Sequence, residues 1–533
     1  MSFLDIGGNG AGYSFMLASV LALTFDIVIR GGRIVDGTGN TWFRGDVAID
    51  GDTIVAVAPR IEGEGRRVID ATGKVVAPGF IDLHTHARGG IFDVPAADNF
   101  ILQGVTTIFE GPDGSSPLPV APFLARVEKQ GVSPNFAIFV GHGSVREQVM
   151  GSVDRAATPA ELEQMKALVR TAMNDGAFGL STGLFYVPGS FASTEEVIEL
   201  AKVAGELGGI HTSHMRDEMA KVTDSVRETI RIGEEGGLPT QITHHKIAGA
   251  RNRGRSTDTL KLLDEARGRG VDVTSDQYPY TASRTGLNAL FPRWALEGGR
   301  EAMLERLGDP ATRARIREAI IESIQYDRGG GDPKNVQIAA APHDASLAGK
   351  TLADVLRARG VEPRVEGAAD LAMELMEKSE VWAIFHMMDE EDVVRILRHP
   401  ATMIASDGEV PVFGKDAPHP RSYGTFARVL GVYVRERKVI TLEDAIRKMS
   451  SYPAARVGIL DRGLLRPGMK ADVVVFDADR IIDKATYTNP HAYAEGVAHV
   501  LVNGVFVVDE GKVTKNRPGK VLRHGVRWSY GKL

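Results

Sequence analysis

The sequence predicts an α/β protein: a (β/α)8 TIM-type barrel with a small β-sandwich built from both chain ends and an inserted helical subdomain. Three observations predict this fold. Eight short apolar runs alternate with helical patterns through the middle of the chain, both ends carry β patterns, and one interval between barrel strands is much longer than the others. At 533 residues the chain exceeds the usual limit of one core, so two structural units are expected.

Both ends of the chain indicate short antiparallel strands. Apolar positions alternate over residues 25–37, 45–58 and 66–79, with Gly, Asp and Asn between the runs, and the same texture returns over 471–480 and 497–512. Such alternation with turn residues between the runs is typical of hairpins. We therefore expect one small sandwich assembled from the two ends.

The expected domain limits follow from these patterns. We expect an N-terminal extension at residues 1–24. The sandwich takes two pieces, 25–78 and 456–533, and the barrel takes 79–455. Residues 15–25 form an apolar stretch of signal-peptide length, too short to span a bilayer. No positive charge precedes it and no clear cleavage site follows, so we predict a degenerate leader and a cytoplasmic protein, with the periplasm left open.

The middle of the chain contains eight expected strands, each followed by a helical pattern or a loop. The strands are 75–86, 105–111, 135–143, 176–183, 208–214, 239–246, 271–280 and 401–408. Helical patterns lie at 158–176, 193–209, 222–237 and 256–270. They begin with Ser, Thr or Val and end with Gly, as is typical of helix ends. Serial β/α units predict a parallel barrel with its active site at the C-terminal ends of the strands.

The long interval at about 287–400 separates the seventh and eighth strands. It contains helical patterns at 300–308 and 311–327 and a glycine-rich turn at 327–332. We interpret it as an inserted subdomain that could cover the barrel mouth.

Composition narrows the function. The net charge is −6 with no long basic run, so nothing points to nucleic acid or to an anionic membrane. There is no cysteine, which excludes disulfides, thiolate metal ligands and cysteine nucleophiles. We expect a small-molecule substrate; the subunit count is open, a homo-oligomer included.

Five residues are spaced like one metal site. Each follows an apolar run that predicts a barrel strand: His84, His86, His214, His244 and Asp407. Alone, each histidine is better explained as a hydrogen-bonded core residue, and Asp407 as a turn or cap residue. Their shared placement at strand ends favours one or two divalent ions with a bound water.

Four further residues near these positions are either poorer candidates for metal ligands or candidates between which the sequence does not decide. His211 lies earlier in its strand than His214, and His245 points to the opposite face from His244. Two ions need a bridging anion besides water, and Glu110 and Asp113 are the available carboxylates after the second strand. Their pattern does not decide between them.

At this point the chain resembles a known family, the amidohydrolase superfamily and, within it, the D-aminoacylase (N-acyl-D-amino-acid deacylase) group. The resemblance runs from about residue 25 to 523. It rests on GGRIVDGTG, APGFIDLHTH, GVTT, FVGHGSVR, GAFGLSTGLFYVPG, SHMRDE, THHK, DQYPYTAS, ASDG, HPRSYGTF, RPGMKADVVVFD and VNG.

The resemblance implies a fold, a cofactor and a reaction. It implies a barrel carrying a β-sandwich, with the same five residues as ligands of zinc, as one or two ions. The implied reaction is hydrolysis of the linear amide of an N-acyl-D-amino acid by metal-activated water. Asp407 would then be the general base and afterwards the proton donor to the leaving nitrogen.

Two departures from the family matter. Relatives have a cysteine ligand in a G-N-C-G turn where this chain reads Gly111-Pro112-Asp113-Gly114, so Asp113 takes that place, with Glu110 as the alternative. An oxygen ligand there leaves metal number and preference open.

The second departure concerns the substrate carboxylate, which the family holds with residues that map onto Tyr278 and Arg421. The family also uses a small hydroxyl residue for this carboxylate, and the corresponding position in this chain is Arg284. Arg284 would grip a second carboxylate, favouring acidic or extended substrates, or else face solvent or pair with an acid. His142 and Arg146 would line the pocket or fix a loop.

Other functions stay open at this stage. A D-dipeptidase is a close alternative. A cyclic-amide hydrolase of the hydantoinase or dihydroorotase kind usually carries a carboxylated lysine on the fourth strand, and residues 176–183 contain no lysine. A non-catalytic scaffold ranks last because all five ligand candidates are present.

Overall fold

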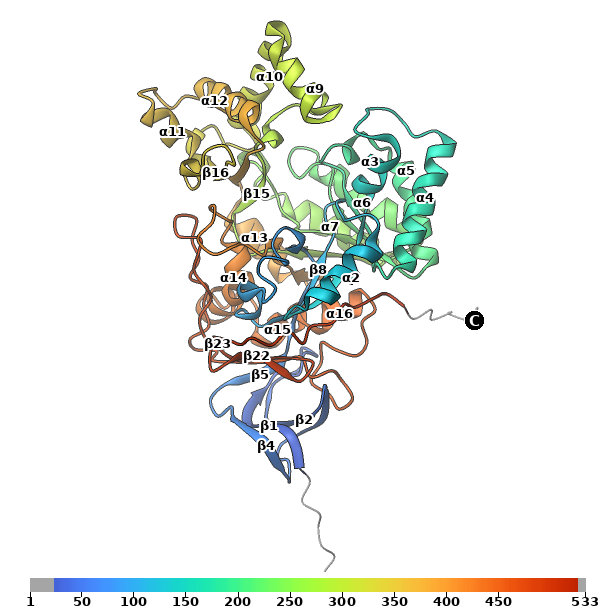
Figure 1. Ribbon diagram of the computed structural model, residues 1–533, viewed down its shortest axis with the longest axis vertical. Coiled ribbons are helices and arrows are strands. Elements are labelled where there is room, and N and C mark those ends of the chain that lie inside the picture. The colour runs from blue at the N-terminus through green and yellow to red at the C-terminus, as the bar shows by residue number, and fades with distance from the viewer. Residues whose placement is uncertain (1–23, 526–533) are drawn as a thin grey trace, which may run out of the picture.

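The computed structural model describes residues 24–525. Along its long axis lie a sheet built from both chain ends, then the barrel, then the inserted elements (Figure 1). All of the expected extension except Thr24, and most of the apolar stretch at 15–25, lie outside the described residues. Within residues 24–525, no helix is both long and apolar enough to cross a membrane.

One nine-stranded sheet joins the two ends of the chain. Its strands are β1 (Thr24–Ile34), β2 (Phe43–Asp50), β3 (Thr53–Ala58), β4 (Glu64–Asp70), β5 (Val75–Pro78), β20 (Val473–Phe476), β21 (Val497–Val502), β22 (Val505–Asp509) and β23 (Lys512–Val513). The antiparallel pair β5–β20 links the N-terminal strands to the C-terminal ones. Ile27, Val47, Val473 and Leu501 share one apolar core, so the sheet bends around its own interior.

Eight parallel positions form the barrel, which confirms the predicted fold. In order they are β6 (Phe80–Asp82), β8 (Val105–Glu110), β9 (Asn135–Ile138) continued by β10 (Val140–Gly141), β11 (Gly179–Gly183), β12 (Ile210–His214), β13 (Thr240–Ile242), β14 (Val273–Gln277) and β18 (Thr402–Ile404). The ring closes where β19 (Gly408–Glu409) pairs with β7 (Thr85–His86) and the Asp407 N–H donates to His84 O at 2.9 Å.

Helices surround the barrel. They include α2 (Val120–Gln130), α3 (His142–Met150), α4 (Pro159–Asn174), α5 (Thr194–Glu206), α6 (Val222–Gly236), α7 (Ser256–Gly268), α13 (Glu390–Arg398), α14 (Arg421–Arg428), α15 (Leu442–Met449) and α16 (Ser451–Arg456). Local chemistry explains the predicted starts: Thr158 forms a capping box with Glu161, and the Ser193 hydroxyl accepts from the Glu196 N–H.

The inserted elements contain a sheet as well as helices. The strands β15 (Ala282–Gly286), β16 (Val336–Ala340) and β17 (Trp382–His386) pair antiparallel in the order β15-β17-β16. The main helices are α9 (Gly299–Gly308), α10 (Pro310–Glu322), α11 (Leu352–Ala358) and α12 (Val365–Lys378).

This small sheet is absent from the sequence prediction, because strands of five residues give little periodic signal beside the helical patterns of the same interval. It begins with β15, a few residues before the predicted start of the insertion. Helix α13, by contrast, packs against α7 and β18 of the barrel. The exact domain limits stay a prediction.

Candidate metal centre

Two groups of side chains converge at the C-terminal ends of the barrel strands. The first contains His84, His86, Asp113 and Asp407, and the second contains Asp113, His214 and His244. In each group the potential ligand atoms lie within 4.8 Å of one another. Asp113 belongs to both groups, so the structure assembles a pair of adjacent sites with one shared carboxylate.

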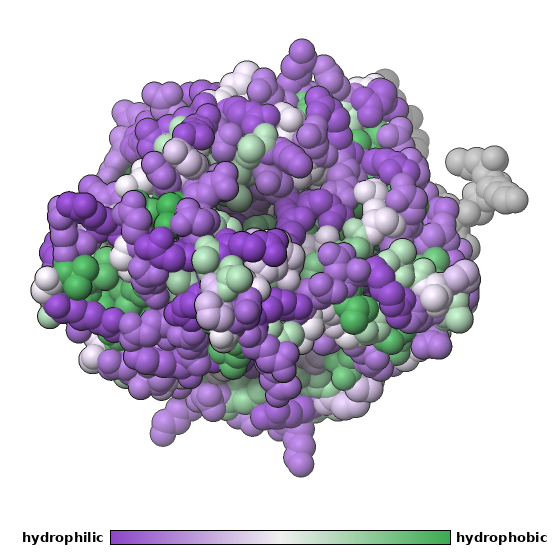
Figure 2. Space-filling view, turned by 90° about the horizontal axis from the view of Figure 1, so that it is seen from above, coloured by the Kyte–Doolittle hydropathy of each residue, from purple (hydrophilic) through white to green (hydrophobic). Residues whose placement is uncertain are grey.

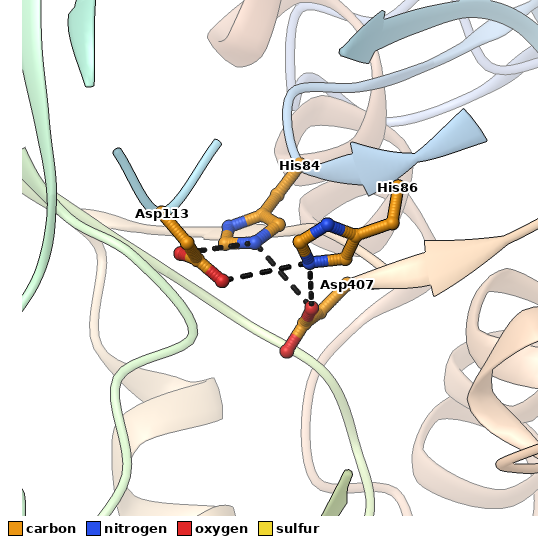
Figure 3. A group of neighbouring side chains, drawn as sticks. All are labelled: His84, His86, Asp113 and Asp407. Carbon is orange, nitrogen blue, oxygen red and sulfur yellow. Dashed lines mark hydrogen bonds and ion pairs between the residues drawn. The ribbon is translucent and has the colours of Figure 1, made fainter. Parts of the chain in front are cut away.

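The first group gathers two imidazoles between two carboxylates (Figure 3). His84 Nε2 lies 3.4 Å from Asp113 Oδ1 and 3.4 Å from Asp407 Oδ1. His86 Nε2 lies 3.5 Å from Asp113 Oδ2 and 3.0 Å from Asp407 Oδ1. Both Nε2 atoms therefore face the same two acids.

The second group lies on the other side of Asp113. His244 Nε2 is 3.3 Å from Asp113 Oδ1, and His214 Nδ1 is 3.7 Å from Asp113 Oδ2. The two imidazoles approach each other at 2.7 Å between His244 Nε2 and His214 Nδ1. Two ring nitrogens that face each other and one carboxylate are the donor set expected of a divalent-ion site.

The backbone is unusual at three of these residues. Asp113, His244 and Asp407 have φ values of 54°, 35° and 52°, in the left-handed region that non-glycine residues rarely adopt. Such conformations cluster at functional sites, where the surrounding structure enforces them. In each case the chain turns sharply just past a strand, and this turn directs the side chain into the cluster.

Buried partners hold these turns in place. The Asp82 carboxylate accepts from the His84 N–H at 3.1 Å and from the Ser406 N–H at 3.0 Å. The Asp276 carboxylate accepts from the His244 N–H at 2.5 Å. The first and last barrel strands are thus tied together directly beneath the first group.

Glu218 and Lys246 form a charged pair behind the second group. Lys246 Nζ lies 2.5 Å from Glu218 Oε1, and both residues are buried. His244 Nδ1 lies 3.1 Å from Glu218 Oε1 and 2.6 Å from Lys246 Nζ. If Nε2 of His244 binds a metal, the ring hydrogen is on Nδ1, and this N–H donates a hydrogen bond to Glu218. Such a hydrogen bond orients metal-binding imidazoles.

The donor atoms fit a divalent cation. The buried atoms His84 Nε2, His214 Nε2 and Asp113 Oδ1 have no hydrogen-bond partner within the described chain. Buried polar atoms without partners are costly, and a bound cation would satisfy those that face the cluster. Nitrogen and carboxylate oxygen donors suit zinc and similar ions.

The charges within the cluster shift its pKa values. Burial would raise the pKa of Asp113, but the neighbouring His84, His244 and His214 hold it well below its usual range. Burial likewise opposes ionisation of Asp407, and Arg421 together with His84 outweighs it, so the Asp407 pKa is also well below normal. Both carboxylates are therefore anionic and available as ligands.

A cavity of about 430 Å³ opens above the cluster. Its wall includes the predicted substrate residues Tyr278, Arg284 and Arg421. Arg421 Nη1 lies 2.8 Å from Asp407 Oδ2, and its guanidinium lies over the Tyr278 ring at 4.8 Å. Arg284 forms an ion pair with Glu409, two residues after Asp407.

Other candidates lie outside the two groups. Glu110 is buried and accepts from the Arg88 N–H at 2.8 Å. His142 is absent from the cavity wall; its Nε2 lies 2.9 Å from Glu196 Oε1, and Arg146 contacts Glu196 Oε2. His142 and Arg146 therefore fix the first turns of α3 against Glu196.

The turn that contains Asp113 is closely packed. Gly114 has a φ of 73°, and a Cβ there would lie 2.6 Å from Gly183 N. A Cβ on Gly141 would lie 2.5 Å from Gly114. The Asp113 turn thus fits closely over the ends of β10 and β11.

The neighbouring histidines lie as the sequence predicted. His211 Nδ1 and Nε2 lie 2.8 Å and 3.0 Å from the Thr240 and Thr182 hydroxyls. His245 Nε2 lies 3.0 Å from the Thr259 hydroxyl. Burial lowers the pKa of each of these histidines to about 3, which keeps both neutral.

Sequence reasoning missed several residues of the cavity wall. They include Glu218, Lys246, Arg328 and Glu409, whereas Tyr186 lies in the GLFYVPG segment, whose aromatic residues were pocket-wall candidates. A signal existed for Lys246, which stands two positions after His244. Arg328 follows the helical segment η5 (Ser323–Asp327) and opens a glycine-rich turn, which resembles an ordinary surface loop.

Comparisons with known proteins agree with this geometry. Residues 67–508 match the amidohydrolase family. The chain is 36% identical over 521 residues to a D-aminoacylase of Alcaligenes xylosoxydans xylosoxydans, covering 93% of this chain and 97% of the relative. It is 36% identical over 523 residues to an N-acyl-D-glutamate deacylase of the same organism, covering 93% and 96%.

A solved structure resembles the whole fold. It is the crystal structure of an N-acyl-D-glutamate deacylase from Bordetella bronchiseptica, complexed with zinc and a phosphonate inhibitor that mimics the tetrahedral intermediate of the reaction. The TM-score is 0.81 at 35% identity, covering 94% of this chain and 100% of that chain.

Proposed function

The chain belongs to the amidohydrolase family and to its D-aminoacylase group, and from this premise we propose that it hydrolyses the amide bond of N-acyl-D-amino acids. Water and the amide become a carboxylate and a free D-amino acid. The observation that supports this most is the pair of donor groups that share Asp113 at the barrel mouth, next to Arg421 in the same cavity.

One or two divalent ions, zinc first, would be held by these residues. His84, His86 and Asp407 would bind one ion, His214 and His244 the other, with Asp113 shared. When bound, such an ion polarises the amide carbonyl and makes water more acidic. Asp113, not Glu110, is our candidate for the shared ligand, because only Asp113 lies among the donors.

Asp407 is the proposed general base. Its Oδ1 lies among the donors and its Oδ2 lies against Arg421, so one carboxylate connects the reacting water to the substrate. Asp407 would take a proton from water as the carbonyl carbon is attacked. It would then return that proton to the amide nitrogen as the C–N bond breaks.

Arg421 and Tyr278 would orient the substrate by its α-carboxylate. The Arg421 guanidinium is 3% exposed, and only Asp407 opposes its charge within the described ion pairs. The buried Tyr278 hydroxyl has no hydrogen-bond partner among residues 24–525. A carboxylate between them would satisfy both groups, with charge-assisted hydrogen bonds from Arg421.

A substrate screen tests the proposal. The zinc-loaded protein is incubated with N-acetyl and N-succinyl derivatives of D- and L-amino acids, with D-dipeptides and with hydantoins, and release of amine is measured. Hydrolysis of N-acyl-D-amino acids above their L-forms supports the function. Preferred cleavage of D-dipeptides would indicate a dipeptidase, and preferred ring opening of hydantoins would contradict the linear-amide assignment.

The cell compartment and the number of subunits stay predictions. We propose a cytoplasmic enzyme. Fractionation of cells that express the full chain, with measurement of its mass in solution, tests both points.

A further inference from the structure

Arg328 is a buried cation without a counter-ion. It is 4% exposed, yet no ion pair or side-chain hydrogen bond within residues 24–525 involves its guanidinium. Its contacts are aromatic: the guanidinium carbon lies 4.5 Å from the ring centre of Phe185 and 5.5 Å from that of Phe385. A charge that is largely buried and unpaired is costly unless a partner arrives, so its position beside a cavity points to a ligand.

The main chain fixes this arginine in place. The Arg328 N–H donates to Ser323 O at 2.9 Å, and the Gly331 N–H donates to Ile324 O at 3.0 Å. A Cβ on Gly329 would lie 2.5 Å from Ile324 O, so the turn closes tightly on the helical segment before it. The position of Arg328 is therefore set before any ligand binds.

Arg328 borders both the catalytic cavity and a second cavity of about 460 Å³. Tyr186 and Met376 also line both spaces, so the two cavities share a wall. Both cavities lie towards the face that carries the inserted elements, which is mainly hydrophilic and is hollowed near its centre (Figure 2).

Phe185 links this arginine to the metal centre. Its ring centre lies 5.9 Å from the ring centre of His214 and 4.5 Å from the guanidinium carbon of Arg328. The guanidinium carbon is thus at most 10.4 Å from the centre of the His214 ring, the total of those two distances. A substrate whose amide lies at the metal centre reaches Arg328 through a short side chain or acyl chain.

Arg284 and Arg328 differ in how their charges are compensated. Arg284 is paired with Glu409, whereas no acid pairs with Arg328. Two acids that line the cavities do not change this: Glu380 borders both cavities but is exposed, and burial raises the pKa of Asp327 above its usual range. Of the two arginines, Arg328 is the one that gains a first partner by binding an anion.

We propose that Arg328 binds a second carboxylate of the substrate, carried by the D-amino acid side chain or by the far end of the acyl group. The inference rests on the proposed deacylase function. A guanidinium that can donate two parallel hydrogen bonds suits a carboxylate better than a neutral amide. The enzyme would therefore prefer dicarboxylic substrates.

Matched substrates test this on the wild-type enzyme. The kcat/KM of the zinc-loaded protein is measured for N-acetyl-D-glutamate against N-acetyl-D-glutamine, and for N-succinyl-D-leucine against N-butanoyl-D-leucine. We expect the charged member of at least one pair to be favoured tenfold to about a hundredfold, as for hydrogen bonds to charged groups. The pair that shows the preference identifies which carboxylate binds.

Variants assign the preference to a residue. Arg328→Gln should abolish it while changing kcat/KM for the neutral substrates by less than about threefold, and Arg328→Lys should retain part of it. Arg293→Gln removes a charge from the second cavity alone and should leave the preference intact. Each preference is a ratio measured on one preparation, so partial unfolding of a variant does not alter it.

The outcomes separate two kinds of failure. Wild-type enzyme without any dicarboxylic preference, or Arg328→Gln that keeps it, overturns the role of Arg328 and leaves the deacylase function standing. If the wild-type enzyme hydrolyses none of the four substrates, the proposed function itself is overturned.

Discussion

The cavity has two walls of different construction. The barrel side consists of strand ends, where His84, His214 and His244 converge on shared carboxylates. The inserted side consists of β15, β17 and the turn after η5, and its arginines rest on aromatic rings: Arg284 on Trp382 and Arg328 on Phe185. Charges on the barrel side compensate one another, while on the inserted side Arg328 has no ion-pair partner within residues 24–525.

This difference separates chemistry from selectivity. The barrel side places the ligand atoms of each donor group within 4.8 Å of one another, as the reaction requires of groups that act together. The inserted side offers an isolated positive charge farther from that cluster. Changes on the barrel side should therefore reduce turnover of every substrate, and changes on the inserted side should alter the choice among substrates.

The largest effect is expected at Asp407. Asp407→Asn removes the general base but keeps the backbone, because Asn tolerates the left-handed conformation. We expect kcat to fall at least about a thousandfold for every substrate when it is measured with zinc kept bound, since His84, His86 and Asp113 remain as donors. Asp416→Asn is the matched control, since Asp416 also has a positive φ, of 60°, and is exposed. Near-normal turnover of Asp407→Asn would remove the assigned role.

The next largest effect distinguishes Asp113 from Glu110. Asp113→Asn should weaken zinc binding by at least about a hundredfold, since a charged shared ligand contributes more than outer-shell partners do. Glu110→Gln should leave zinc binding intact. Zinc content after dialysis and calorimetric titration measure both. Loss of zinc in Glu110→Gln alone would assign the shared ligand to Glu110.

Glu218 should have a smaller effect on the same wall. Glu218→Gln removes the anion beside Nδ1 of His244, and we expect zinc affinity to fall tenfold to a hundredfold. Glu380→Gln, an acid that borders the same cavity away from the donor groups, is the control. Equal zinc affinity in Glu218→Gln and wild type would show that the charged pair behind His244 does not orient it.

The smallest effect is expected at Arg284. Because Glu409 already neutralises it, Arg284→Ser should lower the preference for dicarboxylic substrates only twofold to fivefold, the scale of a partly exposed ion pair. The preference ratios of the matched substrate pairs measure this. A shift as large as that of Arg328→Gln would mean that Arg284 contributes equally to recognition.

The sequence predicted the barrel and the five candidate ligand residues that converge in it, because strand ends carry a local signal. An apolar run followed by His or Asp can be recognised in the sequence, and eight apolar runs in series imply a closed barrel. It did not separate Asp113 from Glu110, because both are acids just past one strand. The separation comes from the left-handed turn at Asp113, a property of the folded chain.

Arg328 shows the limit of such reasoning on the inserted side. Its neighbours Asp327 and Gly329 give it the appearance of a surface turn, and no local pattern indicates burial. Only contact with Phe185 and Phe385, which are far away in the sequence, makes it an interior charge. His142 illustrates the reverse: it follows a strand end as the ligands do, but Glu196 engages it away from the cavity.

The most direct test of the central claim is anomalous X-ray scattering at the zinc edge from crystals of the zinc-loaded protein. The account predicts a peak between His84, His86 and Asp407, a second peak between His214 and His244 when both sites are filled, and Asp113 in contact with each. Crystals with no peak at either group, or with zinc bound elsewhere, would contradict it.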